Sequence, residues 1–409
     1  MPTPPSPLPA RTEPRVLLAV CGGIAAYKSC EIVRRLIDAG CSVRVLMTRN
    51  AERFVGRLTF STLSGHPVLV DPLEADSLSG AEHIDLTLWA DLALVAPATA
   101  NTIGKVANGI ADDFVSTTLC SFDKPQIWAP AMNHRMWANP AVLRNVRTLR
   151  EQGATLIEPG SGWLACGETG PGRLAEVDEI VQTVLHHAFG TQELAGRVVL
   201  VSAGPTVEDI DDVRFLSNRS TGTMGFELAR AAQRMGAIVR LVAGPVNLPT
   251  PLGVCRTNVR SAAEMKAAIE RELDEADVFI SCAAVADYSP VTQPGKIKKG
   301  DGPLKLELPR TADILQELAP RKQHRLFVGF ALESGNALAH GQDKLTRKKL
   351  DLICINDTSE PGAGFGPHTN RLTLLYPDGR SAELPLSSKA DQALGVMRAV
   401  LELLKSRDS

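Results

Sequence analysis

The sequence predicts an α/β protein built of two Rossmann-like, doubly wound domains. The chain has 409 residues, more than one hydrophobic core usually supports, so we expect two domains. An apolar run followed by a glycine turn occurs at Arg15 and again at Arg197. Such runs are typical of parallel strands buried on both faces, and each glycine turn opens a βα unit. We expect a disordered tail at residues 1–14 and domains at residues 15–190 and 191–409.

The composition argues against membrane proteins, nucleic-acid-binding proteins and disulfide-rich proteins. Hydrophobic residues make up 44% of the chain and the net charge is -2, which indicates a soluble globular protein without a general basic surface for nucleic acid. No apolar run reaches the length of a membrane span. The eight cysteines contain no Cys-x-x-Cys pair, which is poor spacing for zinc or a disulfide framework. We therefore expect a cytoplasmic protein that binds neither nucleic acid nor membrane.

The first βα unit begins with a predicted strand at Arg15–Val20. It runs into Cys21-Gly22-Gly23 and then into an amphipathic segment at residues 29–39. An exposed helix N-terminus after a glycine turn favours a phosphate, and the absence of Gly-x-Gly-x-x-Gly suits a mononucleotide better than a dinucleotide. A tight turn that needs glycine for steric reasons alone is equally consistent with this segment.

Two further strands, residues 42–47 and 92–97, extend the predicted parallel sheet. Thr48 follows the first of them and the turn at residues 97–102 follows the second. Ligands of open α/β sheets bind beyond the carboxyl ends of the strands, so we expect both to face the same crevice as Gly22. His83 precedes the third strand. A lone histidine is usually an ordinary surface or core group, so His83 gains weight only from its neighbours.

The stretch from Ser161 to Leu174 contains four glycines and one proline around Cys166. This composition disfavours a regular helix or strand, so we expect a mobile loop that carries the thiol. A small buried thiol in a tight turn is the alternative. A thiol on a lid suggests proton donation over a closed site.

Five motifs in this order resemble the flavin-dependent decarboxylases that act on phosphopantothenoylcysteine. They are Gly22–Ala26, His83, Ala96–Asn101, Pro130–Asn133 and Leu164–Gly167. The resemblance covers about residues 15–188 and implies a flavodoxin-like domain with FMN. It implies His83 as base, Asn133 as ligand of the substrate carboxylate and Cys166 as proton donor. The FMN is expected at Gly22, Gly23, Ile24, Thr48, Ala98, Thr99 and Ala100. Cys21, where serine or threonine is common, and the bulky Trp163 depart from the pattern.

These residue types suit an oxidative decarboxylation. Loss of carbon dioxide from an ordinary amino-acid carboxylate leaves an unstabilised carbanion, so an electron sink is needed first. A flavin can oxidise the neighbouring CH2–SH to a thioaldehyde that accepts the electrons. His83 can remove a proton near neutral pH, and Asn133 can hydrogen-bond the carboxylate without holding it by charge.

The second half restarts the pattern with a strand from Arg197 and a polar loop at residues 210–225, followed by a helix at residues 226–235. The sequence Ser220-Thr-Gly222 can bind a phosphate or simply cap this helix. The run Lys296-Ile-Lys-Lys299 lies among glycines and can be a solvated face or a flap that closes on polyphosphate. Lys344 and Lys348 are four residues apart on an expected helix and share a face.

A second set of motifs resembles phosphopantothenate–cysteine ligase. It comprises Ala203–Thr206, Ser217–Gly222, Ala283–Asp287, Lys296–Lys299, Val328–Phe330 and Asn356-Asp357. The order of the halves matches bifunctional bacterial flavoproteins of coenzyme A biosynthesis. The resemblance implies CTP, Mg²⁺ or another divalent cation, an acyl-cytidylate, and Asn218 and Lys296 as catalytic residues. It places the nucleotide at Ser281, Cys282, Ala283, Asp287, Lys296, Ala312, Asp313, Ile314, Leu315, Phe330, Lys344 and Lys348. Ala312 stands where proline is usual.

The two resemblances together imply ligation of 4'-phosphopantothenate to L-cysteine and decarboxylation of the product to 4'-phosphopantetheine. They also imply a homo-oligomer, in this family a dodecamer. One alternative is an FMN-dependent prenyltransferase, which would not need Asn133 together with Cys166. Another is an FMN-binding regulatory subunit, against which the joint presence of His83, Asn133, Cys166 and Lys296 argues.

Overall fold

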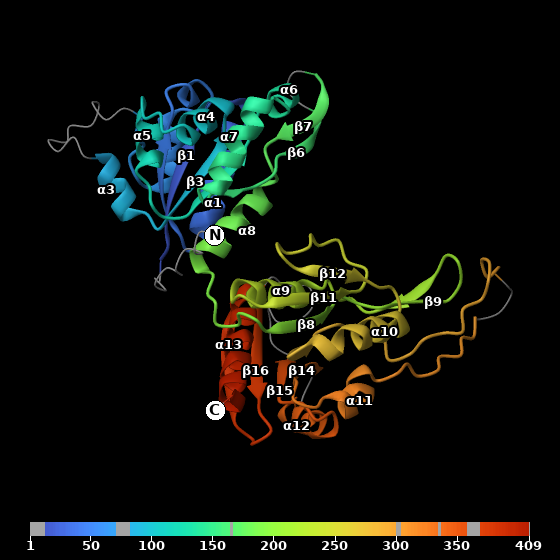
Figure 1. Cartoon of the computed structure of the whole chain (residues 1–409). Helices are drawn as coiled ribbons and strands as arrows, with labels where there is room; N and C mark the ends of the chain where they lie inside the picture. Colours follow the sequence, from blue (N-terminus) through green and yellow to red (C-terminus); the bar gives the residue numbers. More distant parts are fainter. Residues whose placement is uncertain are drawn as a thin grey trace. The chain divides into compact units, whose positions relative to one another are not determined.

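The structure is a computed structural model that describes residues 13–70, 82–163, 167–299, 304–333, 337–357 and 369–408. The chain divides into two compact units, Met1–Gly190 and Thr191–Ser409. The first runs from blue to green and the second from green to red in Figure 1. Most of the expected tail, residues 1–12, lies outside the described residues.

A five-stranded parallel sheet forms the centre of the first unit. Its strand order is β2-β1-β3-β4-β5, the flavodoxin-like order. In β1, an inner strand, every residue from Val16 to Val20 is fully buried, because helices cover both faces of the sheet. The predicted apolar strands are therefore confirmed. The strands are β1 (Arg15–Val20), β2 (Ser42–Met47), β3 (Leu92–Ala98), β4 (Gln126–Pro130) and β5 (Thr155–Leu156).

Helices pack on the two faces of this sheet. Val16, Leu18 and Val20 contact the core beneath α1, α2 and α8. Leu17 and Ala19 point the other way, toward α3, α4, α5 and α7, which is the alternation expected of a strand. The helical elements are η1 (Ile24–Tyr27), α1 (Lys28–Asp38), η2 (Ala51–Arg53), α2 (Arg57–Ser64), α3 (Glu82–Trp89), α4 (Ala100–Ala107), α5 (Phe114–Cys120), α6 (His134–Trp137), α7 (Pro140–Glu151) and α8 (Val177–Phe189).

The glycine-rich stretch is a hairpin, so the expectation of an irregular loop there was wrong. Strands β6 (Gly160–Trp163) and β7 (Thr169–Arg173) pair antiparallel. Backbone pairing needs no side chains, and Gly162 and Gly172 adopt φ angles of 155° and 131° that glycine alone adopts readily. A Cβ at Gly172 would lie 2.3 Å from the carbonyl oxygen of Met132, so glycine allows this close approach. Cys166 itself lies outside the described residues.

The second unit contains an eight-stranded mixed sheet. Its order is β12-β11-β8-β13-β14-β15-β16-β17, and the last two strands are antiparallel to their neighbours. The six parallel strands follow the Rossmann order 3-2-1-4-5-6. The strands are β8 (Val198–Ala203), β11 (Ile238–Ala243), β12 (Cys255–Asn258), β13 (Val278–Ser281), β14 (Leu326–Glu333), β15 (Leu352–Asp357), β16 (Thr369–Leu375) and β17 (Ser381–Ser388). The prediction of two doubly wound domains is confirmed.

Helices α9 and α13 cover one face of the second sheet, and α10, α11 and α12 pack on the other. The expected helix at residues 226–235 begins three residues earlier, at Thr223. The helical elements are α9 (Thr223–Arg234), α10 (Ala262–Glu272), η3 (Leu273–Glu275), α11 (Ile314–Leu318), η4 (Ala319–Arg321), α12 (Ala337–Arg347) and α13 (Lys389–Asp408).

A small hairpin stands apart from the main sheet of the second unit. Strands β9 (Val207–Asp209) and β10 (Phe215–Ser217) pair antiparallel, and β9 extends toward the right of Figure 1. The polar loop expected at residues 210–225 therefore contains β10 and the first turn of α9. This hairpin lies between the carboxyl end of β8 and the start of α9 in the chain.

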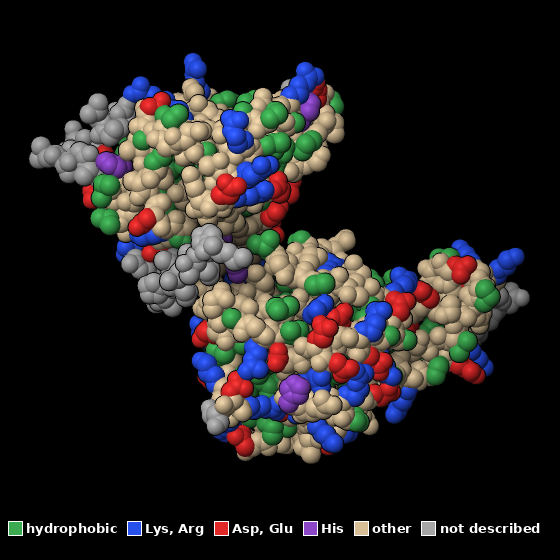
Figure 2. All heavy atoms as spheres, in the orientation of Figure 1, with side chains coloured by type: hydrophobic (Ala, Val, Ile, Leu, Met, Phe, Trp, Pro, Cys, Tyr) green, Lys and Arg blue, Asp and Glu red, His purple; other side chains and the backbone are tan. Residues whose placement is uncertain are grey.

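The visible surface carries charges of both signs. Lys and Arg side chains are interspersed with Asp and Glu side chains on the face shown in Figure 2. Within the described ranges, no helix combines the length and the apolar character needed to cross a bilayer.

Candidate functional sites

A cavity of about 1150 Å³ opens at the carboxyl edge of the sheet in the first unit. The ends of β1, β2 and β3 converge there, as the positions of Gly22, Thr48 and Thr99 in its wall show. Its volume suits a ligand of cofactor size. Predicted residues in the wall are Gly22, Gly23, Ile24, Thr48, His83, Thr99, Ala100 and Asn133. Ala98 is buried and is not part of the wall.

The two glycines after β1 serve different purposes. A Cβ at Gly22 would lie 2.5 Å from the Cβ of Asn50, whereas a Cβ at Gly23 would meet only Thr99 Cγ2, at 4.0 Å. Gly22 is thus required by packing, while Gly23 leaves space in the cavity. Gly23 begins the helical segment at residues 24–38 without a side-chain cap, so amides of its first turn can meet a ligand anion. The Gly22–Gly23 turn therefore fits a phosphate group.

Cys21 does not line the cavity. It is fully buried, and burial raises the pKa of its thiol to about 11, although hydrogen bonds with Thr102 and Thr99 act in the opposite direction. Cys21 stands where the related decarboxylases commonly have serine or threonine. Because its thiol is buried, it cannot contact a phosphate in the cavity. Thr48 Oγ1 instead accepts hydrogen bonds from the amides of Gly22, at 3.2 Å, and Ala51, at 3.3 Å.

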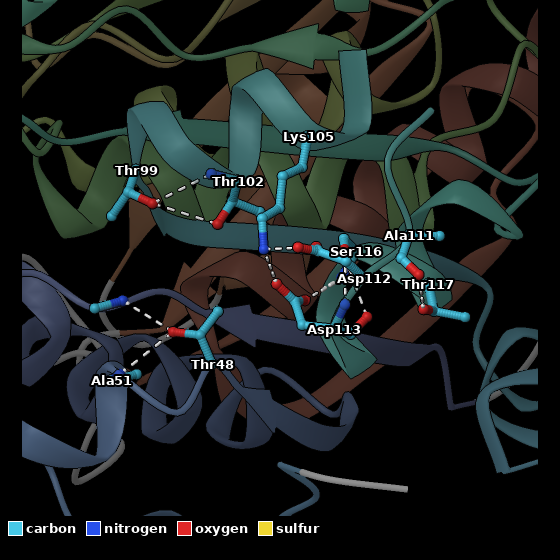
Figure 3. A network of polar contacts seen from close by, with 11 residues as sticks. Thr48, Ala51, Thr99, Thr102, Lys105, Ala111, Asp112, Asp113, Ser116 and Thr117 are labelled. Carbon is cyan, nitrogen blue, oxygen red and sulfur yellow. Dashed lines mark hydrogen bonds and ion pairs between the residues drawn. The ribbon is translucent and has the colours of Figure 1, made fainter. Parts of the chain in front are cut away.

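An ion-pair network forms one side of the cavity (Figure 3). Lys105 extends from α4 and its Nζ lies 2.6 Å from a carboxylate oxygen of both Asp112 and Asp113. Asp113 also accepts a hydrogen bond from the Ser116 amide, 2.8 Å away, and so caps α5. Burial opposes ionisation of Asp113, but Lys105 and Ser116 outweigh it and lower the pKa of this carboxyl. Asp112 and Asp113 likewise raise the pKa of Lys105. Sequence reasoning missed this network.

His83 and Asn133 lie in the same cavity wall. His83 is half-buried in the first turn of α3. The C-terminus of that helix is held by Lys124, whose Nζ donates to the carbonyls of Thr87, Leu88 and Ala90. Asn133 caps α6 by accepting a hydrogen bond from the Arg135 amide, 2.8 Å away. This cap uses the amide oxygen of Asn133 and makes Nδ2 the donor end of the side chain. The exposed Trp163 of β6 also lines the cavity.

A second cavity, of about 820 Å³, opens at the carboxyl edge of the sheet in the second unit. It is lined by Asn218 and by eleven of the twelve predicted nucleotide-binding residues: Ser281, Cys282, Ala283, Asp287, Ala312, Asp313, Ile314, Leu315, Phe330, Lys344 and Lys348. Lys348 follows the last residue of α12 and pairs with Asp313, its Nζ 2.9 Å from the carboxylate. The structure thus brings residues from five segments of the chain to one site.

The start of α9 lies in this second cavity. Gly222 is the N-cap with a φ of 77°, and the helix has no side-chain cap. The Gly222 amide donates to Ser220 Oγ, 3.2 Å away, so the Ser220 side chain does not cap the helix, and the triplet supplies only its N-cap residue, Gly222. Uncapped amides at a helix N-terminus favour an anion.

Among the polar residues of the second cavity that were not assigned as site residues from the sequence, three are buried. Asn356, Asn370 and Lys389 all line it and are nearly fully buried. Burial lowers the pKa of Lys389, while its charge interaction with Cys282 acts in the opposite direction. The motif Asn356-Asp357 was a usable signal because a polar pair ends an apolar strand. Lys389 had no such signal in the sequence, because a lysine at the start of a helix is usually exposed.

Lys296 does not line the second cavity. It is exposed on the segment between β13 and α11, so its contact with the nucleotide stays a prediction. A metal site also stays open, because the described parts of the chain contain no cluster of three or more His, Cys, Asp or Glu side chains placed to hold an ion.

The two cavities and the two sheet topologies together define a class of protein. Each unit is a doubly wound α/β domain with its candidate ligand site at the carboxyl edge of the sheet, where nucleotides and flavins bind in such folds. Residues 6–189 match the family described as Flavoprotein. Residues 194–404 match the DNA/pantothenate metabolism flavoprotein C-terminal domain.

Relatives with established names match nearly the whole chain. The coenzyme A biosynthesis bifunctional protein CoaBC of Bacillus subtilis (strain 168) is 48% identical over 394 residues, covering 95% of this chain and 97% of its own. The protein of the same name from Escherichia coli (strain K12) is 44% identical, with coverages of 92% and 93%. The chain belongs to the family of bifunctional coenzyme A biosynthesis proteins. A cysteine/cysteine sulfinic acid decarboxylase from an unknown prokaryotic organism is 46% identical, with coverages of 85% and 99%.

Proposed function

We propose that this enzyme of coenzyme A biosynthesis ligates 4'-phosphopantothenate to L-cysteine in its C-terminal half and decarboxylates the product in its N-terminal half. The observation that supports the proposal is that the expected site residues of each half lie together in the wall of one cavity in that half. His83 and Asn133 share the first cavity with the Gly22–Gly23 turn. Asn218 and the expected nucleotide-binding residues, Lys296 excepted, share the second.

The first cavity is proposed to hold FMN, with the phosphate at the Gly22–Gly23 turn. When bound, the flavin would supply a reversible two-electron acceptor, which makes decarboxylation of an aliphatic amino acid possible and gives the two electrons back to the decarboxylated thiol. His83 accepts a substrate proton, and Nδ2 of Asn133 donates a hydrogen bond to the carboxylate that leaves. Trp163 shields the substrate from water, and Cys166 returns the proton to the product.

The second cavity is proposed to bind CTP with a divalent cation, most simply Mg²⁺. The uncapped start of α9 meets a phosphate, and Lys344 and Lys348 contribute positive charge that stabilises the transferred groups. Asp313 orients Lys348 through the ion pair described above. Asn218 serves the acyl intermediate, which the amine of cysteine attacks. Lys296 neutralises charge on the departing pyrophosphate.

The test uses the purified full-length chain. We expect a yellow protein with a flavin absorption spectrum, and release of carbon dioxide that requires 4'-phosphopantothenate, cysteine and CTP together. Synthetic phosphopantothenoylcysteine should be decarboxylated without CTP. Release of carbon dioxide from cysteine alone would instead favour the activity named for the cysteine/cysteine sulfinic acid decarboxylase relative. A colourless protein that retains ligation would contradict the proposal for the first half.

The proposal extends to a cytoplasmic homo-oligomer, in line with the dodecamer implied by the resemblance. Light scattering of the purified protein tests the assembly. The prenyltransferase alternative predicts no use of phosphopantothenoylcysteine, and the regulatory-subunit alternative predicts bound flavin without turnover. Both are separated from the proposal by the same carbon dioxide assay.

A further inference from the structure

A short segment that carries Lys296 is bound to the β9–β10 hairpin. We call residues 292–299 the lysine segment. Thr292 Oγ1 donates to the carbonyl of Asp209, 2.9 Å away, and the Gln293 amide donates to the carbonyl of Ile210, 3.0 Å away. The Gly295 amide donates to a carboxylate oxygen of Asp212, 3.1 Å away. The path of the lysine segment is therefore set by the hairpin.

Asp211 is the buried centre of this junction. Only 2% of its surface is exposed. Its Oδ1 accepts hydrogen bonds from the amides of Val213, at 2.8 Å, and Arg214, at 2.7 Å. Its Oδ2 accepts a hydrogen bond from the amide of Ile297, at 3.1 Å. One carboxylate thus shapes the turn between β9 and β10 and holds the residue directly after Lys296.

Ile297 is held through both of its backbone polar groups. Its amide binds Asp211, and its carbonyl accepts a hydrogen bond from a guanidinium nitrogen of Arg214, 2.7 Å away. Burial by itself would raise the pKa of Asp211, but the amides of Val213, Ile297 and Arg214 outweigh it and lower this pKa. The carboxylate is therefore ionised at neutral pH, the state in which both oxygens only accept hydrogen bonds.

The same hairpin reaches the wall of the second cavity. Ser217, the last residue of β10, pairs with Val207, and its Oγ donates to the carbonyl of Thr206, 2.7 Å away. The next residue, Asn218, donates from Nδ2 to the carbonyls of Ala284 and Val285, at 3.0 and 3.2 Å. A continuous set of hydrogen bonds thus joins Asn218 in the cavity to the segment that carries Lys296.

We propose that Asp211 is a positioning residue for the ligase reaction: by holding the Ile297 amide, it sets where Lys296 lies relative to the hairpin that also carries Asn218. Asp211 touches neither substrate nor nucleotide in this proposal. Its effect on the reaction passes through Lys296, so the inference rests on the proposed ligase function of the second half.

The test is a double-mutant cycle on the full-length chain. Asp211→Asn keeps the size but removes the charge and one of the two accepting oxygens. We expect it to lower kcat of CTP-dependent ligation by about tenfold. Its KM for cysteine should change by less than about twofold, since ground-state binding is not affected. Asp378→Asn, in the exposed turn between β16 and β17 and away from the lysine segment, is the control and should ligate at the wild-type rate.

The decisive comparison is made in the Lys296→Gln background. If Asp211 acts only through Lys296, adding Asp211→Asn to Lys296→Gln causes no further loss of kcat. Equal losses in both backgrounds would show a merely structural role and overturn the inference. Wild-type ligation by Lys296→Gln would also overturn it, while leaving CTP-dependent ligation by the chain intact.

A second measurement does not depend on activity. Trypsin cleaves after lysine, and Lys296, Lys298 and Lys299 all lie in the lysine segment. Asp211→Asn should speed cleavage there by about tenfold, because release of the Ile297 amide exposes the backbone. Cleavage at other sites should be unchanged, which separates local release from global unfolding. Equal cleavage rates in Asp211→Asn and the control Asp378→Asn would contradict the proposed anchor.

Discussion

Gly22 and Gly23 show how adjacent identical residues answer different physical demands. The first is confined by the Cβ and carbonyl carbon of Asn50, which a side chain at position 22 would meet at 2.5 and 2.8 Å. The second faces open space and has an extended backbone, with φ of -164°. The sequence left two interpretations open, a turn that needs glycine for steric reasons and a turn that leaves space for a phosphate. The structure fits the first to Gly22 and the second to Gly23.

Substitution of the two glycines should separate folding from cofactor binding. Gly22→Ala overpacks the turn and should lower the free energy of unfolding by about 1–3 kcal/mol. Gly23→Ala should change it by less than about 0.5 kcal/mol, because nothing is displaced. It should nevertheless weaken flavin binding, since its methyl group occupies the ligand space. Urea unfolding of the flavin-free proteins and a fluorescence titration with FMN measure the two effects. Unchanged FMN affinity in Gly23→Ala would contradict the phosphate site.

The Lys105 network should contribute stability over a defined pH range. The folded-state pKa of Lys105 is raised, so its contribution is complete below the unfolded pKa near 10.5 and is lost as pH rises through the folded value. The pKa of Asp113 is lowered, so its contribution is complete above 3.8 and is lost as pH falls through the folded value. The network should therefore stabilise the fold most across the neutral range.

Lys105→Met tests this pH dependence. We expect a loss of about 1 kcal/mol at pH 7, because the partners are partly exposed and screened by solvent. The difference from wild type should shrink below pH 3.8 and above pH 10.5. Urea titrations at fixed pH values measure it. A difference that is constant from pH 3 to pH 11 would show that Lys105 acts through packing of its aliphatic stem.

At the scale of elements, α3 depends on a residue far away in the sequence. Lys124 donates to three carbonyls at the C-terminal end of the helix that carries His83. Carbonyls at a helix end have no partner within the helix, and a lysine there also complements the helix dipole. The position of this short helix is thus tied to the segment before β4.

Lys124→Met should loosen α3 without unfolding the first unit. Removal of a charged donor from three carbonyls should lower the free energy of unfolding by about 1–2 kcal/mol. Amide hydrogen exchange at the end of α3 should accelerate, while exchange in β1 and β3 should stay slow. Lys124→Arg, which retains the charge, is the control. Uniform acceleration throughout the unit would contradict a local role.

The elements also show where sequence reasoning succeeds and fails. Val16 to Val20 could be predicted as part of a parallel strand buried on both faces, because such burial requires an unbroken apolar run. The β6–β7 hairpin was missed because its pairing is made by backbone groups of glycine-rich segments, which carry no strand propensity. The Lys105 network was missed because Lys105 lies on α4 whereas Asp112 and Asp113 precede α5, so the contact depends on the path of the loop between the two helices.

Positions within the sites were predictable only in part. Strand ends could be assigned to the cavities because parallel strands present their carboxyl ends at one edge. The location of Lys296 could not be predicted, because it depends on hydrogen bonds between the lysine segment and the hairpin. No local sequence pattern indicates these bonds. Lys389 could not be predicted either, because burial of a lysine is set by tertiary packing.

At the scale of the whole molecule, each unit has cores of its own. The buried clusters of the first unit contain residues from β1 to α8 alone. Those of the second contain residues from Leu194 to Leu404 alone. Independent cores are the condition under which domains fold separately. We therefore propose a functional boundary near residue 190, the boundary that the sequence predicts.

A fragment of residues 191–409 should fold alone and retain CTP-dependent ligation. It should be colourless, because the proposed FMN site belongs to the other half. Circular dichroism, a thermal melt and the ligation assay on the fragment test this expectation, with the full-length chain as control. An insoluble fragment would place the boundary elsewhere, and a yellow one would contradict the assignment of FMN.

The separation of the buried clusters has a genetic consequence. Among the described residues no buried cluster crosses this boundary, and such a boundary is a point at which one gene can be divided into two, or two genes joined into one, without changes to either hydrophobic core. Joining them in one reading frame makes every round of translation deliver a ligase and a decarboxylase in equal numbers. Covalent fusion of the two domains therefore keeps their amounts equal without separate control of their expression.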